Sequence, residues 1–196
     1  MESKVEPGFD GVVSEQKKAE AGATSTRVSS LVLRIVVVAT TLVAAVVLAV
    51  DRQSKTVSIS LVPTLPPLAV TVTAKSTDSS PFIYFIVANC ITSACSALSL
   101  LISIAKRARN RNNVIMSMAF VDLLVVAVLF SGIGAAATFG VLGERGNSHV
   151  RWNKVCDVYD KFCAKGMISI GVSLVGGLAQ LLLLMLSIVG LHKRSL

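Results

Sequence analysis

The sequence predicts an all-α membrane protein: a bundle of four transmembrane helices with both termini on the cytoplasmic side. Of its 196 residues, 53% are hydrophobic and only 15% are charged, whereas soluble domains carry about 25% charged residues. The apolar residues also gather in four long blocks, and a helix needs about 20 such residues to cross the ~30 Å hydrocarbon core. The blocks use about half of the chain and leave no room for a separate soluble domain.

The predicted spans are residues 31–50, 81–105, 114–142 and 167–191. Residues 1–30 mix charged residues with Ser, Thr, Ala and Gly, and are too polar to bury a core, so we expect a disordered cytoplasmic head. Residues 192–196 form a short cytoplasmic tail. The connection 51–80 contains prolines and alternates β-branched with polar residues over 57–73, which favours a short strand or hairpin there.

Basic residues set the expected orientation. The eight-residue connection 106–113 carries four basic residues and no acid, and such density is retained on the cytoplasmic side. Both termini then lie in the cytoplasm as well. The net charge of +8 is spread over membrane flanks without aromatic interleaving or a zinc pattern, so its predicted partner is anionic membrane lipid and not nucleic acid.

Two charged residues lie inside apolar spans, Arg34 and Asp122. Each costs on the order of 2.5–3.5 kcal/mol at a helix centre on insertion scales. At ~1.5 Å per residue they lie roughly 5–9 Å and 12 Å below the same surface, so a guanidinium could reach the carboxylate. We predict a structural ion pair. Two alternatives stay open: Arg34 snorkels to the head groups alone, and Asp122 is protonated and bonded to a Ser or Thr.

Small residues recur in the third and fourth spans, several at four-residue spacing. They are Gly132, Ala136, Gly140, Ser169, Ser173 and Gly177. Small residues let helix backbones approach closely in lipid. We expect packing within the bundle ahead of a dimer interface, although the two can hold on different faces.

The cysteines divide by location. Cys90 and Cys95 lie inside the second span and should act as small apolar residues. Cys156 and Cys163 lie in the loop expected outside the cell, where disulfides persist, so we predict a bridge. We predict no metal site, because zinc takes four ligands and His149 is the only nearby imidazole.

No catalytic constellation is found in the sequence. The two histidines, His149 and His192, fall on opposite sides of the membrane in this topology. No glycine-rich phosphate loop and no Ser-His-Asp set occurs. We therefore predict neither an enzyme nor a cofactor.

Several segments together resemble the plant Casparian strip membrane protein family and its CASP-like relatives of group 1. They are Leu31–Arg34, Ala39–Ala45, Asp51–Lys55, Ser80–Asn89, Asp122, and the last-loop residues Trp152, Cys156, Phe162 and Cys163. The resemblance covers about residues 27–193. The first outer loop departs from it, because it lacks the aromatic-rich signature of the strip-forming members.

The resemblance implies a MARVEL-like four-helix scaffold of the plasma membrane. Such a scaffold would form homo- and hetero-oligomers with CASP-like proteins, organise an immobile membrane domain, and recruit secreted cell-wall-modifying enzymes around a diffusion barrier. The missing loop signature leaves a role in the strip itself open. The alternative from another class is a small transporter or channel subunit with Arg34 and Asp122 along a polar path. The spans lack the paired broken helices that many transporters use.

Overall fold

Four long helices and a pair of antiparallel strands make up most of the described part of the protein. The computed structural model describes residues 9–59, 68–105, 111–150 and 152–195. Its main elements are α1 (Phe9–Ala49), β1 (Arg52–Ile59), β2 (Leu68–Lys75), α2 (Ser80–Ala105), α3 (Arg111–Arg145) and α4 (Asp160–Ser195). Short 3-10 turns cover Ser76–Asp78 and Ser148–Val150.

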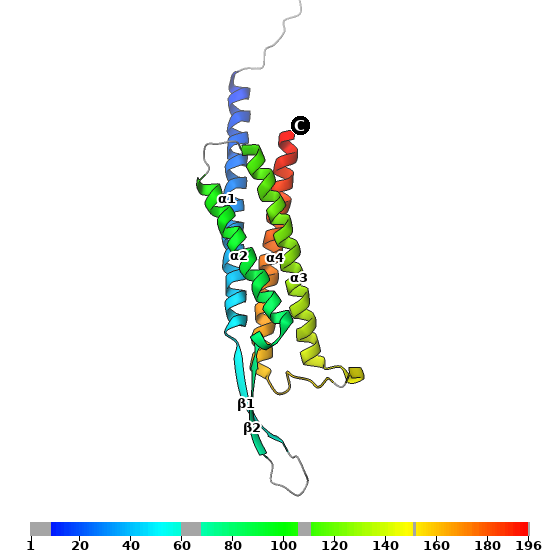
Figure 1. The fold of residues 1–196 in the computed structure, drawn as a ribbon. Coiled ribbons are helices and arrows are strands. Elements are labelled where there is room, and N and C mark those ends of the chain that lie inside the picture. Colours follow the sequence, from blue (N-terminus) through cyan, green and yellow to red (C-terminus); the bar gives the residue numbers. More distant parts are fainter. Residues whose placement is uncertain (1–8, 60–67, 106–110, 151, 196) are drawn as a thin grey trace, which may run out of the picture.

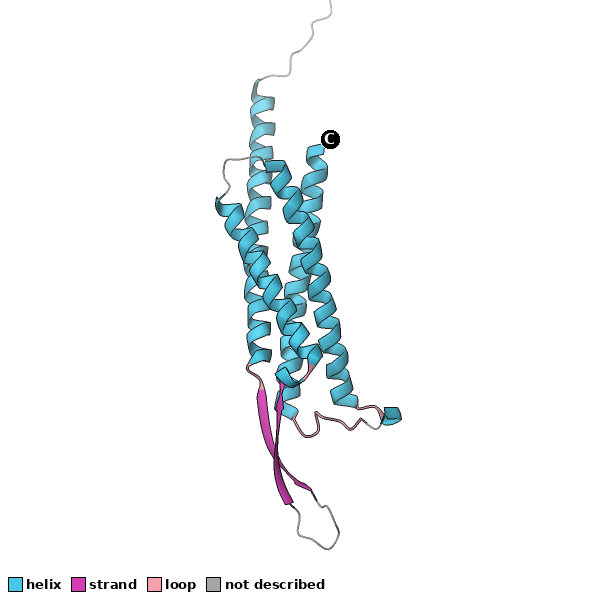
Figure 2. Ribbon diagram, in the orientation of Figure 1, coloured by secondary structure: helices cyan, strands magenta, loops and turns pink. Residues whose placement is uncertain are grey.

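The helices lie alongside one another as a bundle, and the strands extend from one end of it (Figure 1). Each helix packs against its neighbour in the chain, and α4 closes the ring against α1. We call the end with the strands the hairpin end, and the opposite end, where the C-terminus lies, the terminal end. Figure 2 shows helix throughout the described bundle and strand only beyond its hairpin end.

The prediction of four helices able to span a membrane is confirmed. Windows long and apolar enough to cross a membrane run over Val28–Ala49, Ser80–Ile104, Met116–Arg145 and Asp160–Leu191. The fourth span begins seven residues before the predicted residue 167. The extra turns form because the Gln53 side chain accepts a 2.7 Å hydrogen bond from the Phe162 backbone N–H, one of the first N–H groups of α4 that lack a partner within the helix.

The head of the chain differs from the expectation. Residues 1–30 are expected to be disordered, yet α1 begins at Phe9; residues 1–8 lie outside the described part of the chain. Starting a helix is costly, but extending an existing one is not. The span that follows supplies the nucleus, and the head contains Ala, Glu, Gln and Lys, which are good helix formers. Composition alone does not predict this extension, because it describes the head without the helix that follows it.

The expected hairpin is present and longer than residues 57–73. β1 pairs antiparallel with β2, with Arg52 opposite Lys75 and Ile59 opposite Leu68. Hydroxyl groups meet across the strands, with Ser54 Oγ 2.9 Å from Thr73 Oγ1. A lone two-stranded hairpin is only marginally stable in water, so its contacts with the helices matter for its position.

Small residues are used for contacts within the bundle. A Cβ added at Gly132 would lie 2.9 Å from the Ala88 Cβ, and one at Gly177 would lie 3.2 Å from the Phe130 ring. Ala136 is fully buried. The helices therefore approach closely where these residues lie, as intramolecular packing requires.

Other small residues differ in their contacts. A Cβ at Gly140 would meet only Ile170, at 4.0 Å. At Gly176, which the sequence analysis did not single out, an added Cβ would clash with Thr40 at 2.5 Å. Gly134 has nothing within 4 Å of an added Cβ and lies on the outer face of α3. That face is free for contacts outside the bundle.

Candidate functional site: polar links between the helices

The two intramembrane charges meet inside the bundle. Arg34 of α1 donates to both carboxylate oxygens of Asp122 on α3, at 2.8 Å and 3.3 Å. Their exposed fractions are 6% and 2%. A bidentate pair of this kind holds both groups in one geometry and is stronger than bonds between neutral groups. The geometry agrees with the depth argument, because both helices enter the bundle from the terminal end.

The pair continues into a chain that joins all four helices. Gln180 of α4 donates a 2.9 Å bond to Asp122 Oδ1, and Ser96 of α2 donates a 3.3 Å bond to Gln180 Oε1. We call Arg34, Asp122, Gln180 and Ser96 the inner polar network. Both carboxylate oxygens and both ends of the amide are satisfied, as a buried polar network requires to be favourable.

Two further links tie the helices together nearer the hairpin end. Ser173 of α4 donates a 2.8 Å bond to Asn89 Oδ1 on α2, and the Asn89 amide donates in turn to the Phe85 carbonyl. Ser169 of α4 donates a 2.7 Å bond to the Ala44 carbonyl of α1. The predicted small residues Ser169 and Ser173 thus act through their hydroxyl groups as well as through their size.

At the hairpin end, Asp51 is buried with an incomplete set of partners. The Lys165 ammonium lies 3.2 Å from Asp51 Oδ1 as an ion pair, but neither oxygen has a well-aligned hydrogen bond among the described residues. Burial raises the pKa of Asp51 above its ordinary value of 3.8, and the Lys165 charge opposes this shift. The ionised form is therefore less stable here than in water.

The base of the hairpin is attached to the start of α4. Gln53 donates a 3.1 Å bond to Asp160 Oδ1 in addition to accepting from Phe162. Lys55 lies 3.5 Å from the same carboxylate, and the Tyr159 hydroxyl donates a 3.2 Å bond to the Val72 carbonyl. These bonds fix the position of the hairpin, which would be only marginally stable alone.

The loop before α4 is closed by a disulfide. Cys156 and Cys163 are bridged, with Cα atoms 5.7 Å apart. Phe162 is buried against Phe82, with ring centroids 6.1 Å apart, and Trp152 lies edge-on to Phe139. In the second span, Cys90 and Cys95 are free.

Sequence reasoning missed the amide residues. Gln180, Asn89 and Gln53 each join two or more elements, yet none is charged, so a search of the sequence for ionisable residues passes over them. A usable signal for Gln180 was its position, because it is a lone amide within a leucine-rich run whose depth is close to that of Asp122. Asn89 is likewise the only amide residue of the second predicted span, residues 81–105.

The arrangement fixes helix positions more than it offers reactive groups. The links lie at successive levels, and each crosses from one helix to another. Within the described ranges, no group of three His, Cys, Asp or Glu side chains could hold a metal ion.

Comparison with known proteins identifies the family. Residues 23–179 match the model of the Casparian strip membrane protein domain. A CASP-like protein 1E2 of Vitis vinifera is 45% identical over 99% of this chain and 100% of its own length. A CASP-like protein 1E1 of Sorghum bicolor is 52% identical over 85% of this chain and 72% of its own. No solved structure matches. The chain therefore belongs to the CASP-like membrane proteins of the Casparian strip membrane protein family.

Proposed function

We propose that the chain is a self-associating scaffold of the plasma membrane that organises a membrane domain. The observation that carries this proposal is the inner polar network, which joins the four helices and pairs Arg34 with Asp122, the two charged residues inside the apolar runs. A bundle closed in this way presents its outer faces to lipid and to other proteins. The family membership supports the same role.

The outer surface of α2 and α3 offers a face for self-association. Tyr84 is 43% exposed and shares a hydrogen bond with the exposed Ser131 hydroxyl. Gly134 and Thr138 follow on the same outer face of α3. Hydroxyl groups and small residues hold helices together in lipid. The outer face of α4 around Gly171 differs, because it carries apolar residues such as Ile168 and Val175.

The proposed orientation places both termini in the cytoplasm and the hairpin outside. Secreted cell-wall-modifying enzymes recruited by the scaffold would then meet β1, β2 and the loop before α4. Tags fused at residues 2 and 196 should both resist external protease in intact cells. Digestion of either tag would contradict the orientation.

Single-particle tracking in the plasma membrane tests the scaffold. We expect nearly immobile clusters for the natural chain. Gly134→Leu should release faster diffusion, because the new side chain fills the proposed face without a clash inside the bundle. Gly171→Leu is the matched control, since its added Cβ also meets nothing within 4 Å. Free diffusion of the natural chain would overturn the scaffold, and release by Gly171→Leu alone would overturn the assigned face.

A further inference from the structure

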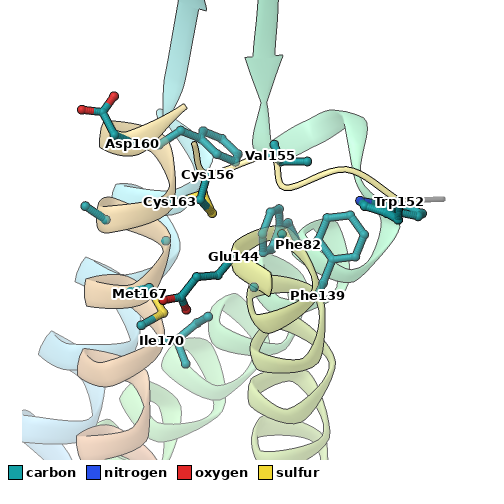
Figure 3. A pocket seen from close by; sticks show the side chains of 15 residues that line it. Phe82, Phe139, Glu144, Trp152, Val155, Cys156, Asp160, Cys163, Met167 and Ile170 are labelled. Carbon is teal, nitrogen blue, oxygen red and sulfur yellow. A yellow bond between two sulfur atoms is a disulfide. The ribbon is translucent and has the colours of Figure 1, made fainter. Parts of the chain in front are cut away.

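A cavity lies at the hairpin end between α3 and α4, next to the loop that joins them (Figure 3). Its volume is about 300 Å³. Space exists there because Gly140, Gly143 and Gly166 have no side chains, and a Cβ added at Gly166 would meet nothing within 4 Å. An apolar cavity of about 150 Å³ is enough to bind benzene, so this one has room for a ring with a substituent.

Aromatic side chains form one wall of the cavity. Phe82 and Phe139 meet edge to face with centroids 5.2 Å apart, and Phe139 meets Trp152 in the same way at 6.1 Å. Met167 and Ile170 lie opposite them (Figure 3). Aromatic faces attract organic cations as well as apolar groups.

The charge in the cavity is negative. Glu144 and Asp160 are its charged residues, and none of the fifteen lining residues is Lys, Arg or His. Asp160 is already bound by Gln53 and Lys55. Glu144 has no hydrogen bond or ion pair with any described residue, and its carboxylate reaches across the cavity toward Met167 (Figure 3).

We propose that this cavity binds a small organic ammonium ion. The apolar body would lie between the aromatic wall and Met167, and the ammonium group would pair with Glu144. This combination of aromatic faces with one free carboxylate suits such a cation, because an anion would meet repulsion and a neutral molecule would leave Glu144 unpaired. A free amine and the ammonium head group of a phospholipid share this chemistry.

Trp152 gives a direct readout, because it is the only tryptophan in the chain. The full-length protein in non-ionic dodecyl maltoside micelles is titrated with 2-phenylethylammonium, and with 2-phenylethanol as its uncharged counterpart. We expect a saturable fluorescence change with tighter binding of the ammonium. Glu144→Gln should weaken ammonium binding by about tenfold or more and leave the alcohol unchanged, since a charge-assisted bond is lost.

Filling the cavity separates binding from partition into the micelle. Gly166→Leu should abolish the saturable signal, and Gly171→Leu on the outer face of α4 should retain it. Displacement of the amine by dihexanoylphosphatidylcholine would support the site with a lipid head group as its source, and failure to displace would support it with a free amine. A signal that does not saturate, that survives Gly166→Leu, or that is indifferent to Glu144→Gln would overturn the proposal.

Discussion

Gln180 of α4 donates its hydrogen bond to the same Asp122 oxygen that accepts from Arg34 of α1. The carboxylate is thus held from two sides by two different helices. Removing either donor leaves the other bound to Asp122. Substitutions of Arg34, Asp122 and Gln180 should therefore differ in how much they destabilise the protein. Arg34 carries the charge that balances Asp122, and Gln180 supplies a neutral bond.

We expect the loss of either Arg34 or Asp122 alone to destabilise the protein more than the loss of both. Arg34→Leu or Asp122→Leu leaves an unpaired buried charge, which typically costs about 3–5 kcal/mol. Each single variant should be retained inside the cell or degraded. The double variant should recover much of the surface level, and quantitative surface labelling of all three checks this.

The same set of variants, extended to Gln180, tests the inner polar network outside the ion pair. In the double variant the Gln180 amide has lost its acceptor, and an unsatisfied buried donor costs about 1–3 kcal/mol. Adding Gln180→Leu to the double variant should therefore recover more of the surface level. Additive losses from the two single variants would show that the pair carries no coupling. Normal surface levels with loss of a solute flux would instead favour a transport role.

The two glycines Gly132 and Gly134 should respond oppositely to substitution. Gly132→Ala places a Cβ 2.9 Å from the Ala88 Cβ, and overpacking typically costs about 1–3 kcal/mol. Gly134→Ala meets nothing within 4 Å and should be neutral or stabilising, since alanine is the better helix former. Thermal unfolding of both variants in the same detergent measures the difference. A stable Gly132→Ala protein would show that α2 and α3 are less closely packed.

The disulfide predicts how many thiols can be alkylated before and after reduction. The chain has four cysteines, and the structure bridges Cys156 with Cys163 while Cys90 and Cys95 are free. Alkylation of the unfolded, unreduced protein should label two thiols, and alkylation after reduction should label all four. Mass spectrometry gives both numbers. Four labels before reduction would contradict the bridge.

The spans and the ion pair could be predicted from the sequence because both follow from distance along a helix. Asp122 and Arg34 enter from the same side, so counting residues gives their depths. The bonds of Gln53 could not be predicted in this way. Its partners, Asp160 and Phe162, are more than a hundred residues away, and only the closed ring of helices brings them together.

The helix α1 begins at Phe9, well before the predicted start of the span at residue 31, for a reason that also lies outside the segment itself. Residues 9–30 have the composition of a disordered segment, but they are joined to a span that is already helical. Composition indicates how much apolar surface a segment can bury. It does not indicate whether a neighbouring helix can continue into that segment. The start of α4 at Asp160 was missed similarly, because its cap comes from β1.

The stability of the protein should depend on the protonation of Asp51. Its pKa is raised in the folded protein by burial, above the ordinary value of 3.8 that applies to the unfolded chain. Between these two pKa values the unfolded chain has released the proton and the folded protein still holds it. Stability should therefore fall as the pH rises from 3.8 through the raised pKa, and should not change further from this cause above it.

Asp51→Asn is the variant that isolates this effect. An amide has the same shape and no charge to bury, so the fall in Tm across that window should be smaller than in the natural chain. Lys165→Met should act in the opposite direction, because it removes the only described cation within 4 Å of the carboxylate. The fall in Tm should then be steeper and reach a higher pH. Thermal unfolding of the three proteins across the acidic range compares them, and identical profiles for the natural chain and Asp51→Asn would show that Asp51 stays ionised.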